Sequence, residues 1–142
     1  MNIEIFALCD AATEGDGKLN LLGAFDSVGA REEPVTIAHC SLALRLRFNR
    51  IESGSHRIRL ALVDADGRAV IPPFDTAMDI RLREPQESAV ANLILNLQQV
   101  KVGPFGRYAV DLAVDGRQEG SLPFFVKPIA NPTVETRHDP HP

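Results

Sequence analysis

The chain has 142 residues, which suits a single domain, and its composition of 44% hydrophobic and 24% charged residues is typical of globular proteins rather than disordered ones. Its formal net charge of −4 argues against general nucleic-acid binding. No apolar run approaches the roughly 20 residues needed to cross a bilayer, so we expect no membrane contact.

The amino-terminal region is predicted to be a β-hairpin. Residues 2–12 and 18–29 flank Glu14-Gly15-Asp16-Gly17, a cluster of turn-forming residues. The first arm lacks a basic leader, so we interpret it as a strand and not as a secretory signal. Both arms carry apolar residues on both faces, and both faces therefore need a cover. Loops or the carboxyl-terminal tail would supply it within the chain; the alternative is a subunit or partner interface, formed by Phe6, Leu8, Leu22, Ala24 and Val28.

Five more strands are predicted in the middle of the chain. They cover residues 36–49, 56–64, 68–71, 76–83 and 89–100, and apolar and polar residues alternate in all but the short segment 68–71. The longest alternation directs five residues inward: Cys40, Leu42, Leu44, Leu46 and Phe48. Pro72-Pro73 ends the strand at 68–71, because proline cannot donate a hydrogen bond to a neighbouring strand.

Residues 105–127 are predicted to form a final hairpin that turns at Asp115-Gly116, a dipeptide suited to the positive φ angles of a type I′ turn. A plain two-residue loop would place polar residues of the second arm opposite core residues of the first. A shift of one residue brings Tyr108 opposite Phe124 and corrects the pairing. Either a three-residue loop or a bulge produces this shift, and we favour a bulge at Gly120. Phe124 is then expected in the core.

Eight or nine short strands separated by turn residues, with no stretch of helical spacing, predict an all-β fold. We expect an antiparallel two-sheet β-sandwich, immunoglobulin-like or similar, formed by residues 1–127. Residues 128–142 contain four prolines and no alternation, so they are predicted to be a tail outside the domain.

Six segments carry a resemblance to a known family: EIFALCDAAT, KLNLLGAFD, SLALRLRF, VIPP, NLILNLQ and GRYAVDLAVDGRQEGSLPFFV. Together they resemble a family of small uncharacterised bacterial proteins classed as a domain of unknown function. The resemblance covers about residues 2–127. It implies a cytosolic β-sandwich, and it implies no activity, cofactor or functional residue.

Three pairs of arginines at a spacing of two lie on the outward faces of predicted strands: Arg45 and Arg47, Arg57 and Arg59, Arg81 and Arg83. If these strands are adjacent, six guanidinium groups share one sheet face, where like charges repel each other. Interleaved carboxylates would relieve the repulsion, and the candidates are Asp79, Glu84, Asp111 and Glu119. The alternative is a bound phosphate, polyanion or acidic protein surface. No aromatic residue lies between the arginines, which argues against a platform for single-stranded nucleic acid.

The sequence contains no motif that points to catalysis or metal binding. Asp64-x-Asp66-Gly67 lacks the remaining ligands of a calcium loop, and the histidines lack ligand spacing. Cys9 and Cys40 are interpreted as small buried thiols of a cytosolic protein. We therefore expect no enzyme, no cofactor and no metal. The expected function is a non-catalytic binding or assembly module that forms a homo-oligomer or binds a protein partner, with anion binding by the arginines as the alternative.

Overall fold

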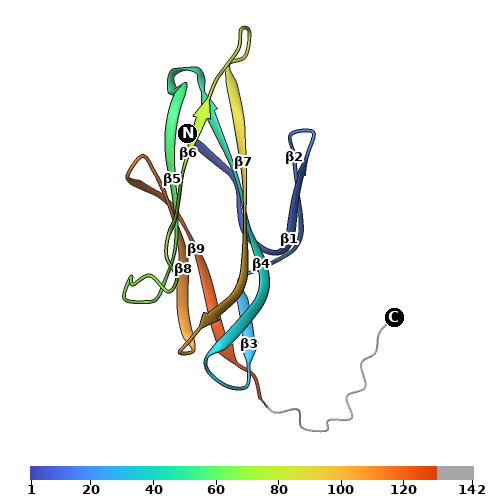
Figure 1. Ribbon diagram of the computed structural model, residues 1–142, viewed down its shortest axis with the longest axis vertical. Helices are drawn as coiled ribbons and strands as arrows, with labels where there is room; N and C mark the ends of the chain where they lie inside the picture. Colours follow the sequence, from blue (N-terminus) through green and yellow to red (C-terminus); the bar gives the residue numbers. More distant parts are fainter. Residues whose placement is uncertain (131–142) are drawn as a thin grey trace, which may run out of the picture.

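The computed structural model describes residues 1–130, which form nine β-strands in two sheets and no α-helix (Figure 1). Sheet A has the strand order β2-β1-β4-β7, with β1 (Asn2–Gly15), β2 (Lys18–Phe25), β4 (Val35–Asn49) and β7 (Ser88–Val102). Sheet B has the order β3-β9-β8-β5-β6, with β3 (Ser27–Ala30), β5 (Gly54–Val63), β6 (Phe74–Ile80), β8 (Gly106–Val114) and β9 (Arg117–Pro128). A 3₁₀ turn at Arg50–Glu52 joins β4 to β5.

The predicted all-β, two-sheet fold is confirmed, but the prediction of a purely antiparallel sandwich is wrong. All neighbours in sheet A are antiparallel, whereas β3 lies parallel to β9 in sheet B. The cause is a crossover at Asp26, whose carbonyl accepts a 2.8 Å hydrogen bond from the N–H of Phe125 in β9. The single strand predicted at residues 18–29 is therefore two strands, one in each sheet.

Two further predictions concern residues 68–71 and the carboxyl-terminal tail. The prediction of a strand at residues 68–71 is wrong, because this segment makes only one isolated bridge, between Val63 and Ala69. The predicted tail lies outside the described residues from position 131 onward, and β9 ends at Pro128. Among the described residues there is no helix of the length and hydrophobicity that a membrane crossing requires.

The final hairpin has the register that the alternation predicts. Tyr108 lies opposite Phe124, and the register shifts where Leu112 faces Gly120 and the next pair is Ala113 with Gln118. Glu119 is therefore the extra residue of a bulge beside Gly120, as predicted. A Cβ at Gly120 would lie 3.0 Å from the Cδ1 atom of Ile3, so glycine also allows β1 of the opposite sheet to approach.

The core lies between the two sheets. The five inward residues of β4 are all buried, and so are their counterparts across the interior, which include Ile58, Leu60, Tyr108, Val110, Leu112 and Phe124. Phe124 is 1% exposed, and its ring lies near those of Phe25 and Tyr108, with centroids 6.3 and 6.4 Å away.

The outer face of sheet A is covered by the chain's own β1–β2 hairpin, which turns back beside the sheet (Figure 1). The carbonyl oxygen of Gly17, at the tip of the hairpin, accepts hydrogen bonds of 3.2 Å from Arg45 of β4 and from Asn92 of β7. This cover accounts for the complete burial of Ser41 and Ala43, which lie on the outer side of β4.

Candidate functional site

The structure does not bring the five predicted interface residues together on one surface. A bulge between Ile3 and Ile5 changes which side chains of β1 point toward the core. As a result, Leu8 is part of the core and Phe6 packs against it. Val28 also packs against the core, from β3. Leu22, which is 71% exposed, and Ala24 are the two that face solvent.

The six arginines do not share one sheet face. Arg45 and Arg47 lie on β4 in sheet A, whereas the next pair, Arg57 and Arg59, lies on β5 in sheet B. The third pair follows the last residue of β6, Ile80. The chain passes from one sheet to the other between β4 and β5, which separates pairs that are close in sequence.

Five of the six arginines have a carboxylate partner. Glu4 of β1 lies between Arg45 and Arg47, with N–O distances of 2.9 and 2.5 Å, and these hydrogen bonds lower the pKa of Glu4. Asp75 of β6 contacts the pair on β5, at 3.1 Å from Arg57 and 3.6 Å from Arg59.

Of the carboxylates predicted to neutralise the arginine pairs, Asp79 does so and two others have different partners. Arg81 pairs with Asp79 at 2.7 Å, so Asp79 is the one predicted carboxylate that neutralises the arginine pairs. Glu84 pairs instead with Arg50 at 3.2 Å, and Asp111 accepts a hydrogen bond from Ser121. Sequence reasoning missed Glu4 and Asp75 because their role depends on strand order, which alternation does not specify.

The feature that sequence reasoning missed is the free edge of β7, by which we mean the side of residues 88–98 that faces away from β4. Strand β7 ends sheet A, and within residues 1–130 no strand pairs with its far side. These eleven residues, SAVANLILNLQ, contain no charged residue and no proline. The sequence shows that this strand is uncharged, but it does not show that the strand lies at the edge of a sheet.

The backbone groups on this free edge can be identified. The N–H of Arg50 donates to the carbonyl of Glu87 at 3.0 Å, one step beyond the pair Asn49–Ser88. Hydrogen-bonded and non-hydrogen-bonded pairs alternate in an antiparallel ladder. The residues whose N–H and C=O groups point to the free edge are therefore Ser88, Val90, Asn92, Ile94, Asn96 and Gln98.

The other three sheet edges are short or charged. Strand β3 has four residues, and β2 has eight, beginning with Lys18 and bending at Gly23, where φ is 70°. Strand β6 has seven residues and carries Asp75 and Asp79. Short length, charge and irregularity are the usual protections against edge-to-edge pairing, and β7 has none of them before Gln99.

Gln99 ends the regular part of the free edge. Its φ is 51°, and the ladder to β4 skips the pair that it would form with Ala38. On the inner side of the strand, Leu93, Leu95 and Leu97 remain half-buried because no strand covers them laterally. A further strand added at residues 88–98 would satisfy the free backbone groups and cover these leucines.

A histidine–aspartate pair lies at one end of the molecule. The Nδ1 atom of His56 lies 2.7 Å from the Oδ2 atom of Asp115, and its Nε2 lies 2.6 Å from the carbonyl oxygen of Glu52. The ring also stacks on Phe48, with centroids 4.6 Å apart. Both ring nitrogens are occupied within the chain, so the pair joins β5 to the β8–β9 turn and leaves no nitrogen for proton transfer to a substrate.

The titratable groups of the described residues offer no metal centre. Within residues 1–130, no group of three or more histidine, cysteine, aspartate or glutamate side chains is arranged to hold a metal ion. Cys9 and Cys40 are both buried and free, and burial raises the pKa of each thiol.

Fold and site together define an all-β domain of two sheets, one of them mixed, with one long uncharged edge. The chain belongs to a family of unknown function (DUF6941), whose model matches residues 4–127. This assignment confirms the resemblance seen in the sequence segments.

Two other comparisons add little. Curated proteins give no significant match. Among solved structures, the chain is similar to the Pseudomonas fluorescens alkylpurine DNA glycosylase AlkC bound to DNA containing an abasic site analog, with 14% sequence identity and a TM-score of 0.44. The match covers 72% of this chain and 28% of that chain, and a likeness of this degree carries no argument.

Proposed function

We propose that this protein is a non-catalytic assembly module that forms a homodimer by pairing β7 of one chain with β7 of a second chain. The observation that carries the proposal is the eleven-residue free edge at residues 88–98, which is long, regular and uncharged. Such an edge is a template for another strand.

A second copy suits this edge better than an unrelated strand. Antiparallel pairing about a two-fold axis at Ile94 places Asn92 opposite Asn96 of the other chain and Leu93 opposite its Leu95. On the outer face the two asparagines meet and Ile94 meets its own copy, and on the inner face Leu97 meets Ala91 beside the paired leucines. No like charges face each other, because the paired segment has no charges. The product is one continuous sheet of eight strands.

The alternative from the sequence, anion binding by the arginines, has less support. Five of the six guanidinium groups already contact carboxylates, and the three pairs do not share one sheet face. We retain the cytosolic location as part of the proposal, and it is supported by the two buried free thiols.

The test compares two proline variants at sheet edges. Ile94→Pro removes a free N–H from the β7 edge without removing a bond to β4, and it obstructs an incoming strand. Ala77→Pro is the matched control, because Ala77 is exposed on β6, an edge strand of the other sheet. The carbonyl of its partner Arg57 bonds to Asp115 on the β8 side, so the N–H of Ala77 also points to a free edge.

Native mass spectrometry and light scattering give the oligomeric state. We expect the wild-type protein and Ala77→Pro to have twice the 15.5 kDa mass of the chain, and Ile94→Pro to have the mass of one chain. A wild-type monomer up to about 100 μM, far above the Kd of a stable dimer, would overturn the proposal. So would a dimer that survives Ile94→Pro, or a complex in which the strand on β7 comes from a different protein.

A further inference from the structure

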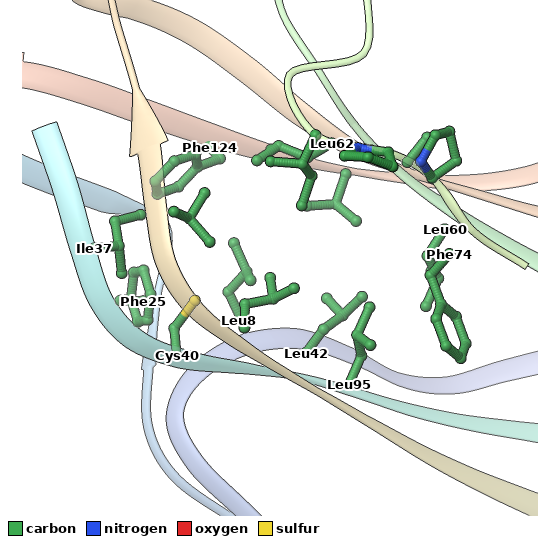
Figure 2. A pocket seen from close by; sticks show the side chains of 17 residues that line it. Leu8, Phe25, Ile37, Cys40, Leu42, Leu60, Leu62, Phe74, Leu95 and Phe124 are labelled. Atoms are coloured by element: carbon green, nitrogen blue, oxygen red, sulfur yellow. The ribbon is translucent and has the colours of Figure 1, made fainter. Parts of the chain in front are cut away.

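A cavity of about 210 Å³ lies between the two sheets, and every residue that lines it is apolar. Leu8, Cys40 and Leu42 contribute from sheet A, and Leu60, Leu62 and Phe124 contribute from sheet B. Figure 2 shows these side chains directed toward a shared space from both sides. Interiors are normally packed without voids of this size, so the cavity is a departure that calls for an explanation.

The exposure of the lining residues locates the entrance. The six side chains named above are buried, whereas Ile71, Pro73 and Phe74, from the segment before and at the start of β6, are half-buried. Leu95 and Leu97 of β7 are half-buried as well. These residues mark an opening between β7 and the segment that contains Pro72-Pro73, and Phe25 and Ile37, which are also half-buried, line the other end of the cavity (Figure 2).

The lining restricts the chemistry of a ligand. It contains no charged side chain, and the thiol of Cys40 is the one side-chain group in it that is not a hydrocarbon. All buried side-chain nitrogen and oxygen atoms in the described part of the chain already have a hydrogen-bond partner, so none is available to a polar ligand. A hydroxyl or carboxylate placed inside would lose its hydration without compensation.

We propose that this cavity is a binding site for a small, uncharged, apolar molecule, somewhat larger than benzene. An apolar cavity of roughly 150 Å³ stays dry and binds benzene, and this cavity is larger. A ligand of this kind restores the dispersion contacts that an empty cavity lacks. The inference rests on residues of one chain and not on the pairing of β7, although a strand paired there would cover Leu95 and Leu97 beside the opening.

The test uses p-xylene as the probe and 4-methylbenzoate as its charged counterpart of similar size. Methyl-resolved NMR titration of the full chain should show saturable shifts with p-xylene, largest for Leu42, Leu60 and Leu62. The charged probe should leave these methyl signals in place. Saturable binding should also raise the melting temperature.

A matched pair of variants separates cavity binding from adsorption elsewhere. Leu95→Phe places extra volume in the cavity, whereas Leu93→Phe makes the same change two residues away on the same face of β7, where the residue does not line the cavity. We expect p-xylene affinity to fall by at least about tenfold in Leu95→Phe and by less than about twofold in Leu93→Phe.

Three outcomes would overturn the proposal. They are the absence of saturable p-xylene shifts in the wild-type protein, equal binding of 4-methylbenzoate, and shifts confined to methyl groups outside the cavity. All three are measured on the wild-type chain, so the test remains decisive if Leu95→Phe fails to fold.

Discussion

Phe124 is the residue whose burial the hairpin register predicts most directly. Its side chain is 1% exposed and contacts the core from β9, while the next residue, Phe125, faces the other side of the sheet and is half-buried. We expect Phe124→Ala to lower the free energy of unfolding by about 3 to 5 kcal/mol. Phe125→Ala is the matched control and should cost clearly less. Urea denaturation measures both, and equal losses would contradict the assigned register.

His56 and Asp115 form a pair whose charge depends on pH. Burial lowers the pKa of His56, but its contacts with the Glu52 carbonyl and the Asp115 carboxylate outweigh burial, and the net pKa is raised above 6.5. The hydrogen bond from His56, followed by that from the Arg57 N–H, lowers the pKa of Asp115 below 3.8. The interaction is strongest where histidine is protonated and aspartate is ionised.

We therefore expect a defined pH window for the stability that this pair contributes. The contribution of His56 is fully present below pH 6.5 and is lost as the pH rises through the raised pKa of the folded state. The contribution of Asp115 is present above pH 3.8 and is lost as the pH falls through its lowered pKa. The measurement is the free energy of unfolding against pH for the wild-type protein and His56→Gln. Their difference should be largest between these two values, and a difference independent of pH would refute the assignment.

At the scale of elements, Gly23 gives β2 an irregular backbone opposite Asp10 of β1. Its φ is 70°, and a Cβ there would lie 2.3 Å from the Oδ2 atom of Asp10. Asp10 is able to rotate away, but the positive φ remains unfavourable for any residue with a side chain. The ladder between β1 and β2 skips the pair Asp10–Gly23, so the two strands are irregular at this point.

We expect Gly23→Ala to lower the free energy of unfolding by about 1 to 3 kcal/mol, because of this backbone strain. Gly15→Ala is the control in the same hairpin, since Gly15 has no positive φ and a Cβ there meets nothing within 4 Å. Its effect should stay within about 0.5 kcal/mol. Denaturant unfolding gives both values, and hydrogen exchange at Ser41 and Ala43 should accelerate in Gly23→Ala alone. Equal behaviour of the two variants would argue against backbone strain at position 23.

At the scale of the whole molecule, dimerisation through β7 links stability to concentration. Ligands or subunits that bind the folded state alone raise its apparent stability by mass action. We expect the melting temperature of the wild-type protein to rise as its concentration increases from about 1 to 100 μM, and that of Ile94→Pro to stay constant. Differential scanning calorimetry at several concentrations makes the comparison. A wild-type melting temperature that is independent of concentration would count against assembly.

The sequence alone determined the local structure of this protein. Alternation of apolar and polar residues identified most strands, because side chains of a strand point to opposite faces in turn. The bulge beside Gly120 and the burial of Phe124 followed from the same rule, since a register error of one residue places polar groups in the core. Asp115-Gly116 has the positive φ angles, 52° and 79°, that its turn requires.

Only the tertiary structure decided which strands are neighbours and what covers each face. Alternation is a property of one strand, whereas sheet order depends on the burial and backbone hydrogen bonds of the whole chain. For this reason the crossover at Asp26, the pairing of Glu4 with two arginines and the division of the arginines between sheets were not predictable. The same reason applies to the free edge of β7 and to the cavity, because an edge is a strand that lacks a neighbour and a cavity is space that two sheets leave between them.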